Sequence, residues 1–238
     1  MPMRKVFFLT GTDTEIGKTT VACGLLAAAM ARGLSTAAIK PVASGCIQTD
    51  DGLRNADALR LWRLCSQPLA YREVNPAAFE PAIAPHIAAE ECGRSLSVDE
   101  SSSSVMSVVE KAAEFTLIEG AGGWRVPLNR EEYLSSLAVR LRFPVILVVG
   151  IRLGCINHAL LTAEAIVRDD LPLSAWVANI VDPETSRIRE NLETLRSALT
   201  CPCLGIVPHM PDPNPEAVAA HLALDALLDE GDERNESQ

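Results

Sequence analysis

The sequence has 238 residues, of which 48% are hydrophobic and 22% charged, a composition typical of a globular protein and unlike that of a disordered chain. The formal net charge of −10 disfavours binding to a nucleic-acid backbone or an anionic lipid surface. A bound polyphosphate therefore has to be held by a local cluster of backbone N–H groups, lysines and metal.

The length and the terminal segments indicate one domain in the cytoplasm. Single α/β domains reach about 250 residues, so we expect one domain over residues 1–228 and a frayed acidic tail over residues 229–238. The apolar run before Gly11 has five residues, fewer than the roughly 7 to 15 of a signal-peptide core. No segment approaches the roughly 20 apolar residues of a membrane span. Seven scattered cysteines, an odd number, favour neither disulfides nor a zinc site.

Apolar β-type runs alternate with stretches of helical period along the chain. This alternation predicts an α/β fold with a mostly parallel sheet and helices on both faces. The expected strands, in chain order, are Lys5–Thr10, Thr36–Lys40, Phe115–Glu119, Val145–Gly150, Ala175–Val181 and Leu204–Val207.

Local chemistry marks several helix ends. The first helix is expected to run from near Gly17 to Arg32, with Gly33 as its C-terminal stop. A capping box, Ser97 with Glu100, predicts a helix through residues 101–114. Two further helix starts are indicated by a capping side chain before a proline, at Asp182-Pro183 and Asn214-Pro215.

The stretch Pro41–Arg94 differs from the rest because it is rich in Pro, Ala, Asn and Gly. It contains one short helical segment around Ala56–Cys65 and no clear strand, so we expect a long elaborated connection. Long ordered loops in compact domains tend to carry function.

The segment GTDTEIGKT, residues 11–19, lies directly after an expected strand and opens an expected helix. This is the context of a phosphate loop, in which glycines let successive N–H groups point at phosphates and the helix N-terminus adds a positive dipole end. Lys18 would reach the outer phosphates, and the Thr19 hydroxyl would hold magnesium. Five residues, one more than in the general pattern, separate Gly11 from Gly17.

Two carboxylates are candidates for the same site, because magnesium prefers hard oxygen ligands. Glu119 ends an expected strand, and the glycines that follow it leave room for close backbone approach. Asp57 lies in the long connection, where a helix cap or a surface position is the competing interpretation. Lys40 ends another strand. Its side chain is either exposed to solvent, as for most lysines, or a second cation beside Lys18 that stabilises a transferring phosphoryl group.

Seven segments occur in an order that resembles dethiobiotin synthetase: TGTDTEIGKT, IKPVASG, GLRNADA, IEGAGGW, PVILVVGIRLGCINHALLT, WVANIV and LGIVP. The match runs from about Val6 to Asn214, and the longer loop is the family's own variant. The resemblance implies a phosphate-loop NTPase-type sheet and an ATP-dependent ligase that converts 7,8-diaminopelargonic acid and CO2 to dethiobiotin in biotin biosynthesis. A carbamate and a carbamic-phosphoric anhydride are the implied intermediates.

The resemblance also implies the site residues. Lys40 and Lys18 would be catalytic, and Mg²⁺ would be held by Thr19, Asp57 and Glu119. The ATP site would comprise Glu15, Ile16, Gly17, Lys18, Thr19, Thr20, Asp57, Glu119, Gly120, Ala121, Gly122, Asn179, Ile180, Pro208, His209, Met210 and Glu216. The substrate would contact Thr14, Ser44, Gly154, Cys155, Ile156 and Asn157. The last four open a helix that in the family receives the substrate carboxylate from the neighbouring subunit, so a homodimer is implied.

Two positions depart from the family pattern at the base end of the site. Ile180 stands where a more polar residue is expected, and His209 stands where the family often has tryptophan. These departures bear on base selectivity and leave the phosphate chemistry unchanged.

Two rival functions remain at this point. A nucleotide switch is suggested because residues 179–182, N-I-V-D, resemble the guanine-reading N-K-x-D motif, but the lysine is missing. This rival predicts hydrolysis controlled by a partner protein without a diamine. The second rival is an amide-forming enzyme of the kind that acts on cobyrinic acid, for which we expect a separate glutaminase domain that this sequence does not contain.

Overall fold

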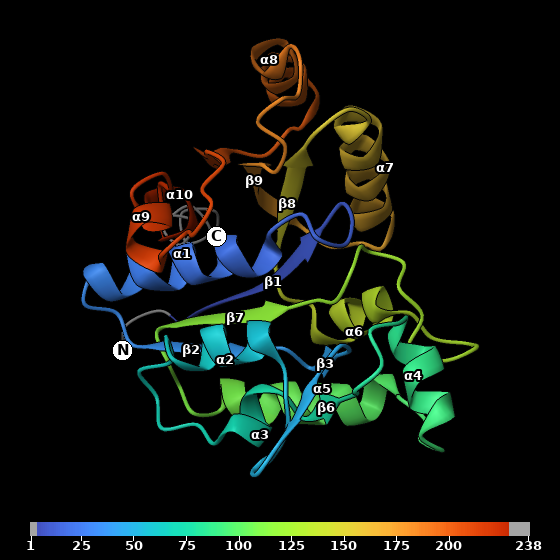
Figure 1. Cartoon of the computed structure of the whole chain (residues 1–238). Helices are drawn as coiled ribbons and strands as arrows, with labels where there is room; N and C mark the ends of the chain where they lie inside the picture. Colours follow the sequence, from blue (N-terminus) through green and yellow to red (C-terminus); the bar gives the residue numbers. More distant parts are fainter. Residues whose placement is uncertain (1–3, 229–238) are drawn as a thin grey trace, which may run out of the picture.

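A computed structural model describes residues 4–228, and the tail expected at residues 229–238 lies outside them. Its centre is a six-stranded sheet with the strand order β10-β9-β8-β1-β7-β2, in which every neighbouring pair is parallel (Figure 1). The strands are β1 (Lys5–Gly11), β2 (Thr36–Ile39), β7 (Phe115–Glu119), β8 (Val145–Ile151), β9 (Leu173–Ile180) and β10 (Cys203–Val207). All six expected strands are confirmed, with ends that differ by at most two residues.

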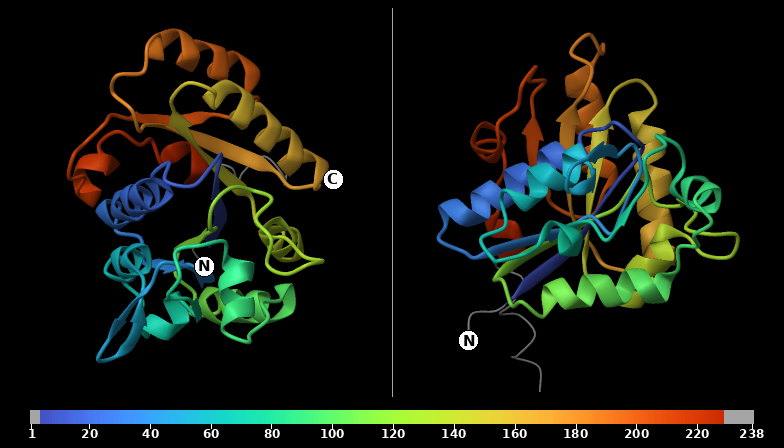
Figure 2. Two further views of the ribbon diagram at one scale, coloured as in Figure 1. Left: turned by 45° about the vertical axis from the view of Figure 1, so that its right-hand side comes forward. Right: turned by 60° about the horizontal axis from the view of Figure 1, so that its bottom comes forward.

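Helices cover both faces of this sheet, as the sequence predicts. Helices α1 (Lys18–Ala31) and α9 (Pro215–Ala219) pack side by side on one face, and α5 (Val98–Val109), α6 (Leu134–Leu141) and α7 (Cys155–Arg168) cover the other (Figure 2). Helix α8 (Ile188–Ala198) packs beside α7, and α10 (Asp225–Leu228) follows α9 along the chain. The central strands are buried on both sides, which explains their continuous apolar sequences. Within residues 4–228, no helix is long and apolar enough to cross a membrane.

Two of the three capping predictions place a helix start correctly. The Ser97 side chain accepts a hydrogen bond from the Glu100 N–H at the start of α5, and Asn214 accepts one from Ala217 at the start of α9. Helix α5, however, ends at Val109 and not at residue 114. The chain leaves the helical conformation at Ala112, whose φ is 65°, and the Glu114 carboxylate accepts hydrogen bonds from the backbone and side chain of Ser35 just before β7.

The helix start predicted at Asp182 is wrong. The Asp182 carboxylate accepts a hydrogen bond from the Glu184 N–H at 3.0 Å, so it stabilises a turn, and α8 begins only at Ile188. Asp and Asn side chains satisfy turns and helix starts by the same local hydrogen bond, which is why the sequence alone does not distinguish them.

The long connection after β2 contains more structure than the sequence predicts. Helix α2 (Ala56–Trp62) matches the expected segment, but α3 (Tyr71–Val74), α4 (Pro85–Glu91) and two small sheets are also present. One sheet pairs β3 (Val42–Ala43) with β6 (Ala77–Ala78), and the other is a hairpin of β4 (Ile47–Thr49) and β5 (Gly52–Arg54). Strands of two or three residues are too short to show a period in the sequence.

One glycine of the outer strand β10 allows a close approach between two backbones. A Cβ atom on Gly205 would collide with the carbonyl oxygen of His221, in the segment that bridges to β10. We expect Gly205→Ala to lower the free energy of unfolding by about 3 kcal/mol, because backbone atoms cannot move aside as side chains do. Chemical denaturation would measure this change, with Gly123→Ala as the control because a Cβ there meets only ordinary contacts. Equal stability of the two variants would contradict the expectation.

Candidate active site

A cleft of about 390 Å³ lies where the carboxyl ends of β1, β2 and β7 meet the N-terminus of α1. In parallel α/β sheets, ligands bind at this edge. The cleft is lined by residues of the glycine-containing loop, the strand ends and α2: Thr14, Glu15, Gly17, Lys18, Thr19, Thr20, Lys40, Ala43, Ser44, Asn55, Asp57, Arg60, Glu119, Ala121 and Gly122.

The loop before α1 has the backbone conformation of an anion-binding turn. Gly17 has a φ of 78° and caps α1, while Glu15 has a φ of 57°, which is uncommon for a residue other than glycine. Such left-handed residues turn consecutive N–H groups to the same side. A side chain at Gly17 would overlap the amide nitrogen of Asn179. The close packing of Asn179 against the loop and the left-handed backbone both require glycine at this position.

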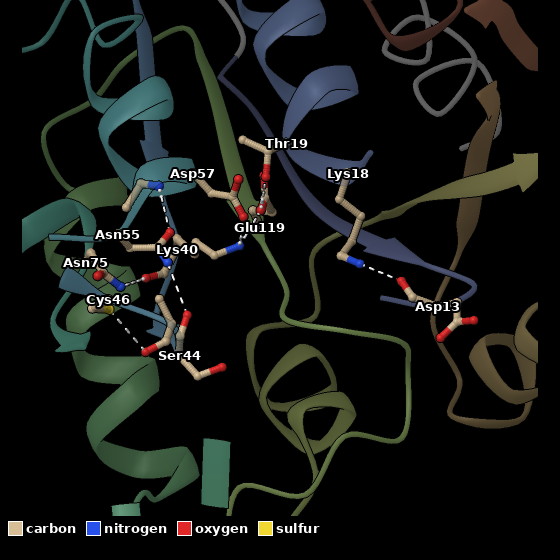
Figure 3. Close-up of polar contacts among 12 residues, drawn as sticks. Asp13, Lys18, Thr19, Lys40, Ser44, Cys46, Asn55, Asp57, Asn75 and Glu119 are labelled. Atoms are coloured by element: carbon tan, nitrogen blue, oxygen red, sulfur yellow. Dashed lines mark hydrogen bonds and ion pairs between the residues drawn. The ribbon is translucent and has the colours of Figure 1, made fainter. Parts of the chain in front are cut away.

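Lys18 is buried at the start of α1. Its Nζ donates a hydrogen bond to the carbonyl oxygen of Asp13 at 2.7 Å, so its side chain folds back along the loop (Figure 3). Burial lowers the pKa of Lys18 to about 8; the negative charge of Glu119 opposes this shift, and the positive charge of Lys40 adds to it. The ammonium is therefore poorly solvated, which favours its interaction with an anionic ligand.

The Asp13 side chain connects this loop to the next strand. Its carboxylate forms an ion pair with Arg152, which directly follows β8, and also accepts a hydrogen bond from the Thr14 N–H at 2.8 Å. The sequence analysis did not single out either residue of this pair. Because both side chains are partly exposed, their attraction positions the loop and contributes little to overall stability.

Two buried side chains, those of Thr19 and Lys40, converge on one carboxylate oxygen. Glu119 Oε1 accepts a hydrogen bond from the Thr19 hydroxyl at 2.8 Å and another from Lys40 Nζ at 2.5 Å (Figure 3). Lys40 Nζ also lies 3.4 Å from Asp57 Oδ2. The structure thus brings together residues from α1, α2, β7 and the end of β2 that are separated by up to 100 positions in the sequence.

The charges in this cluster determine the protonation of Lys40. Burial by itself lowers the pKa of Lys40, but the Glu119 and Asp57 carboxylates outweigh burial, so the pKa lies above its ordinary value. Asn75 holds the backbone nearby, because its side-chain amide donates to the Lys40 carbonyl oxygen at 2.8 Å and the Lys40 N–H bonds the Val74 carbonyl at 2.7 Å. Lys40 is therefore a charged side chain on a fixed backbone.

The oxygen atoms at this point suit a magnesium ion. Thr19, Asp57 and Glu119 are all hard-oxygen donors, and Glu119 Oε2 is buried without a hydrogen-bond partner among the described residues. Within residues 4–228, no cluster of three or more His, Cys, Asp or Glu side chains is placed to hold a metal by itself. A magnesium ion bound here would thus also need phosphate or water oxygens, as is usual for this ion.

A second pocket of about 190 Å³ adjoins the first and shares Glu15, Gly17 and Thr20 with it. It is lined further by Asn179, Ile180, Val181, Val207, Pro208, His209, Met210 and Pro213. Asn179 is buried, and its amide nitrogen donates to the Ile16 carbonyl oxygen at 2.8 Å, so one of its hydrogen-bonding groups is engaged by the loop. Glu15, Thr20, Asn179 and His209 are the polar side chains of the lining, and the other lining side chains are apolar.

Several predicted site residues are not part of the lining of either pocket. The Ile16 side chain is in the hydrophobic core, Gly120 bonds the Leu9 carbonyl and lines neither pocket, and Glu216 lies in the first turn of α9 outside the second pocket. The segment Gly154–Asn157 opens α7, with Gly154 as its N-cap at a φ of 92°, and does not line the cleft of its own chain.

Two polar residues of the cleft, Asn55 and Arg60, were not among the predicted site residues. Asn55 caps α2 by accepting from the Ala58 N–H at 3.1 Å, and its amide donates to the Ser44 carbonyl oxygen at 3.2 Å. Arg60 lines the cleft three residues after Asp57. The sequence could have indicated Arg60, because residues three apart on a helix share a face and Arg60 follows Asp57 by three. Asn55 lies in the segment GLRNADA, from which only Asp57 was predicted as a site residue.

A strand, a glycine-containing loop and a helix that begins with Lys18 and Thr19 define a phosphate-loop nucleotide-binding protein. A family model described as "AAA domain" matches residues 5–217. The fold is similar to that of the MinD cell division protein from Aquifex aeolicus, with a TM-score of 0.56 at 16% identity over 94% of this chain and 93% of that one. A ParA family ATPase from Chlorobium tepidum gives a TM-score of 0.52 at 13% identity over 93% and 92%.

Closer relatives define the family. The ATP-dependent dethiobiotin synthetase BioD of Pseudomonas paraeruginosa is 64% identical over 221 residues, which cover 93% of this chain and 97% of the relative. That of Cellvibrio japonicus is 56% identical over 226 residues, covering 95% and 99%. The chain belongs to the ATP-dependent dethiobiotin synthetase family, a family of ligases.

Proposed function

We propose that this chain uses ATP to join CO2 to 7,8-diaminopelargonate and close the ureido ring of dethiobiotin, in the cytoplasm, as a step of biotin biosynthesis. The observation that carries the proposal is the convergence of Lys18, Lys40 and Glu119 on one cleft beside the phosphate loop. The names and the high identity of the curated relatives support the same reaction. A guanine-reading nucleotide switch, by contrast, would need a lysine where Ile180 stands.

The proposed reaction has three steps. One amine of the substrate attacks CO2, loses a proton and becomes a carbamate. A carbamate oxygen then attacks the terminal phosphorus of ATP, the bond to the ADP oxygen breaks, and a carbamic-phosphoric anhydride forms. Finally, the second amine attacks the carbonyl carbon and loses a proton, phosphate leaves with the bonding electrons, and the ring closes.

The cleft residues would serve the phosphoryl transfer by positioning and by charge neutralisation, which are the main demands of this chemistry. The loop from Glu15 to Thr20 would surround the phosphates, and Lys18 would contact their outer oxygens. Lys40 would stabilise the charge on the transferring group. Thr14 and Ser44 line the same cleft and would contact the reacting end of the diamine.

Thr19, Asp57 and Glu119 would hold Mg²⁺ together with phosphate oxygens of the nucleotide. Their donor set and the partnerless buried oxygen of Glu119 support this assignment. When bound, the ion would neutralise charge on the phosphates and fix their orientation.

The second pocket would hold the base of the nucleotide. Asn179, Ile180, Pro208, His209 and Met210 line it, in continuity with the loop. Glu216, which lies outside this lining in the first turn of α9, would contact the ribose. The site residues that the resemblance implied thus stay predictions whose test is a nucleotide complex.

We also propose a homodimer in which the α7 start, Gly154–Asn157, binds the substrate carboxylate of the neighbouring subunit. Free N–H groups at a helix N-terminus suit an anion. Exposed apolar side chains on and before this helix support a protein partner: Leu153, Leu161 and Val167 are 96%, 57% and 63% exposed.

Phosphate release from ATP distinguishes the synthetase from the switch. We expect release to require both diaminopelargonate and bicarbonate as the CO2 source, and dethiobiotin to form in equal amount with phosphate. The same assay without the diamine is the control. Phosphate release that is independent of the diamine would reject the proposed function in favour of a nucleotide switch.

A further inference from the structure

The Lys40 ammonium contacts both carboxylates that are proposed to hold the metal. Its Nζ contacts Glu119 Oε1 at 2.5 Å and Asp57 Oδ2 at 3.4 Å, and the third proposed ligand, Thr19, bonds the same Glu119 oxygen. Lys40 and Glu119 are only 6% and 1% exposed, so water contributes little to neutralising this carboxylate. The positive charge of Lys40 does so instead.

We propose that Lys40 and the divalent cation compete for Glu119 and Asp57: the ammonium neutralises these carboxylates first, and arrival of the metal nucleotide releases it toward the terminal phosphoryl group. This inference rests on the proposed function, because it assumes that the metal nucleotide binds in this cleft. It assigns Lys40 a second role, as the cation that keeps the metal site closed.

Electrostatics favours such an exchange. Both a magnesium ion and an ammonium are stabilised by direct contact with the same carboxylates, and they repel each other at contact distance. Glu119 Oε1 already accepts two hydrogen bonds, and the other oxygen of Glu119 lies buried with no partner among the described residues. The ammonium lies between Glu119 and Asp57, so a metal held by both carboxylates takes its place.

The local structure allows this movement at small cost. The backbone of Lys40 is fixed on both sides by Val74 and Asn75, so the strand end does not have to move. The side chain has four rotatable carbon–carbon bonds, and its ammonium lines the cleft where the loop and Ser44 also lie. Rotation of one side chain is sufficient to carry the charge from Glu119 to a ligand in the cleft.

The test measures metal binding without nucleotide and without the diamine, so it is independent of the synthetase reaction. Mn²⁺ serves as the probe, detected by electron paramagnetic resonance, on the wild type and on Lys40→Met, which keeps an unbranched side chain but removes the charge. We expect Lys40→Met to bind Mn²⁺ about tenfold more tightly or better, because a charge-assisted hydrogen bond no longer competes. Thermal unfolding should agree, with millimolar Mn²⁺ raising the Tm of Lys40→Met far more than that of the wild type.

Two control variants separate competition from a general loss of positive charge. Lys18→Met removes the other buried cation of the cleft, whose Nζ bonds Asp13 and not Glu119, and should gain much less Mn²⁺ affinity. The Lys40→Met/Glu119→Gln double variant should lose the gain. Equal Mn²⁺ affinity of Lys40→Met and wild type, or an equal gain in Lys18→Met, would overturn the inference even if the synthetase reaction is confirmed.

A second measurement needs no variant of Lys40. The chain has four lysines, so the side-chain ammonium signals of ¹⁵N-lysine-labelled protein can be assigned individually. Mg²⁺ with a non-hydrolysable ATP analogue should shift the Lys40 signal away from that of an ammonium bonded to carboxylate. An unchanged Lys40 signal under saturation with the analogue would show that the lysine stays on Glu119, and would contradict the exchange.

Discussion

Replacing Lys40 with alanine is expected to lower the turnover of dethiobiotin formation by about a thousandfold. Removal of one preorganised charge at a developing anion costs on the order of 10²- to 10³-fold, and cationic groups at a transferring phosphoryl group contribute as much or more. The buried position of Lys40 beside Glu119 makes its charge effective, since water screens it little. The affinity for the nucleotide should fall much less than turnover, because the phosphate loop remains intact.

Steady-state kinetics with saturating diamine and bicarbonate would measure this effect, and circular dichroism would verify the fold. Lys111→Ala is the matched control: this lysine is half-exposed, pairs with Glu73 at 3.4 Å and lies far from the cleft, so its removal should change turnover less than about twofold. Turnover of Lys40→Ala near that of the control would remove Lys40 from the mechanism.

Lys18→Ala is expected to have a comparably large effect of a different kind. Lys18 lies within the phosphate loop and would contact ground-state and transition-state phosphates alike, so both nucleotide affinity and turnover should fall. We expect kcat/KM for ATP to decrease by about a thousandfold or more, with a clear rise in KM for ATP. The KM for the diamine should change less, since Lys18 bonds the loop carbonyl of Asp13 and is not oriented toward Ser44.

Titration calorimetry with a non-hydrolysable ATP analogue would test the loss of affinity directly. Lys111→Ala again serves as the control, and Lys18→Arg tests whether charge without the lysine geometry is sufficient. The assignment of Lys18 to the phosphates would be contradicted if the analogue bound Lys18→Ala as tightly as it binds the wild type.

The sequence was a good guide to every element that has enough residues to show a period. Six strands were placed within two residues because the central parallel strands, which are covered on both faces, are continuous apolar runs. The small strands between Val42 and Ala78 were missed, since their pairing depends on partners distant in the chain. At Asp182 the same side-chain hydrogen bond serves a turn where a helix cap was expected.

In the candidate site, too, the sequence predicted the part built by one continuous segment and missed residues that act through distant contacts. The loop from Gly11 to Thr19 was recognised from its own residues, because a phosphate loop is built by one continuous segment. Arg152 and Asn55 were missed because their relevance arises from contacts with Asp13 and Ser44, which no local pattern records. The curated relatives identify the family, and the structure adds how its residues are placed.

By itself, the sequence determined the α/β class, the six strands, the phosphate loop and the family, since each depends on local periodicity or on a contiguous motif. Only the tertiary structure decided that Lys40 contacts Glu119 and Asp57, and that Asn179 holds the loop. The physical reason is that a buried charge is fixed by its neighbours in space, and those neighbours come together only when the parallel strands align their carboxyl ends.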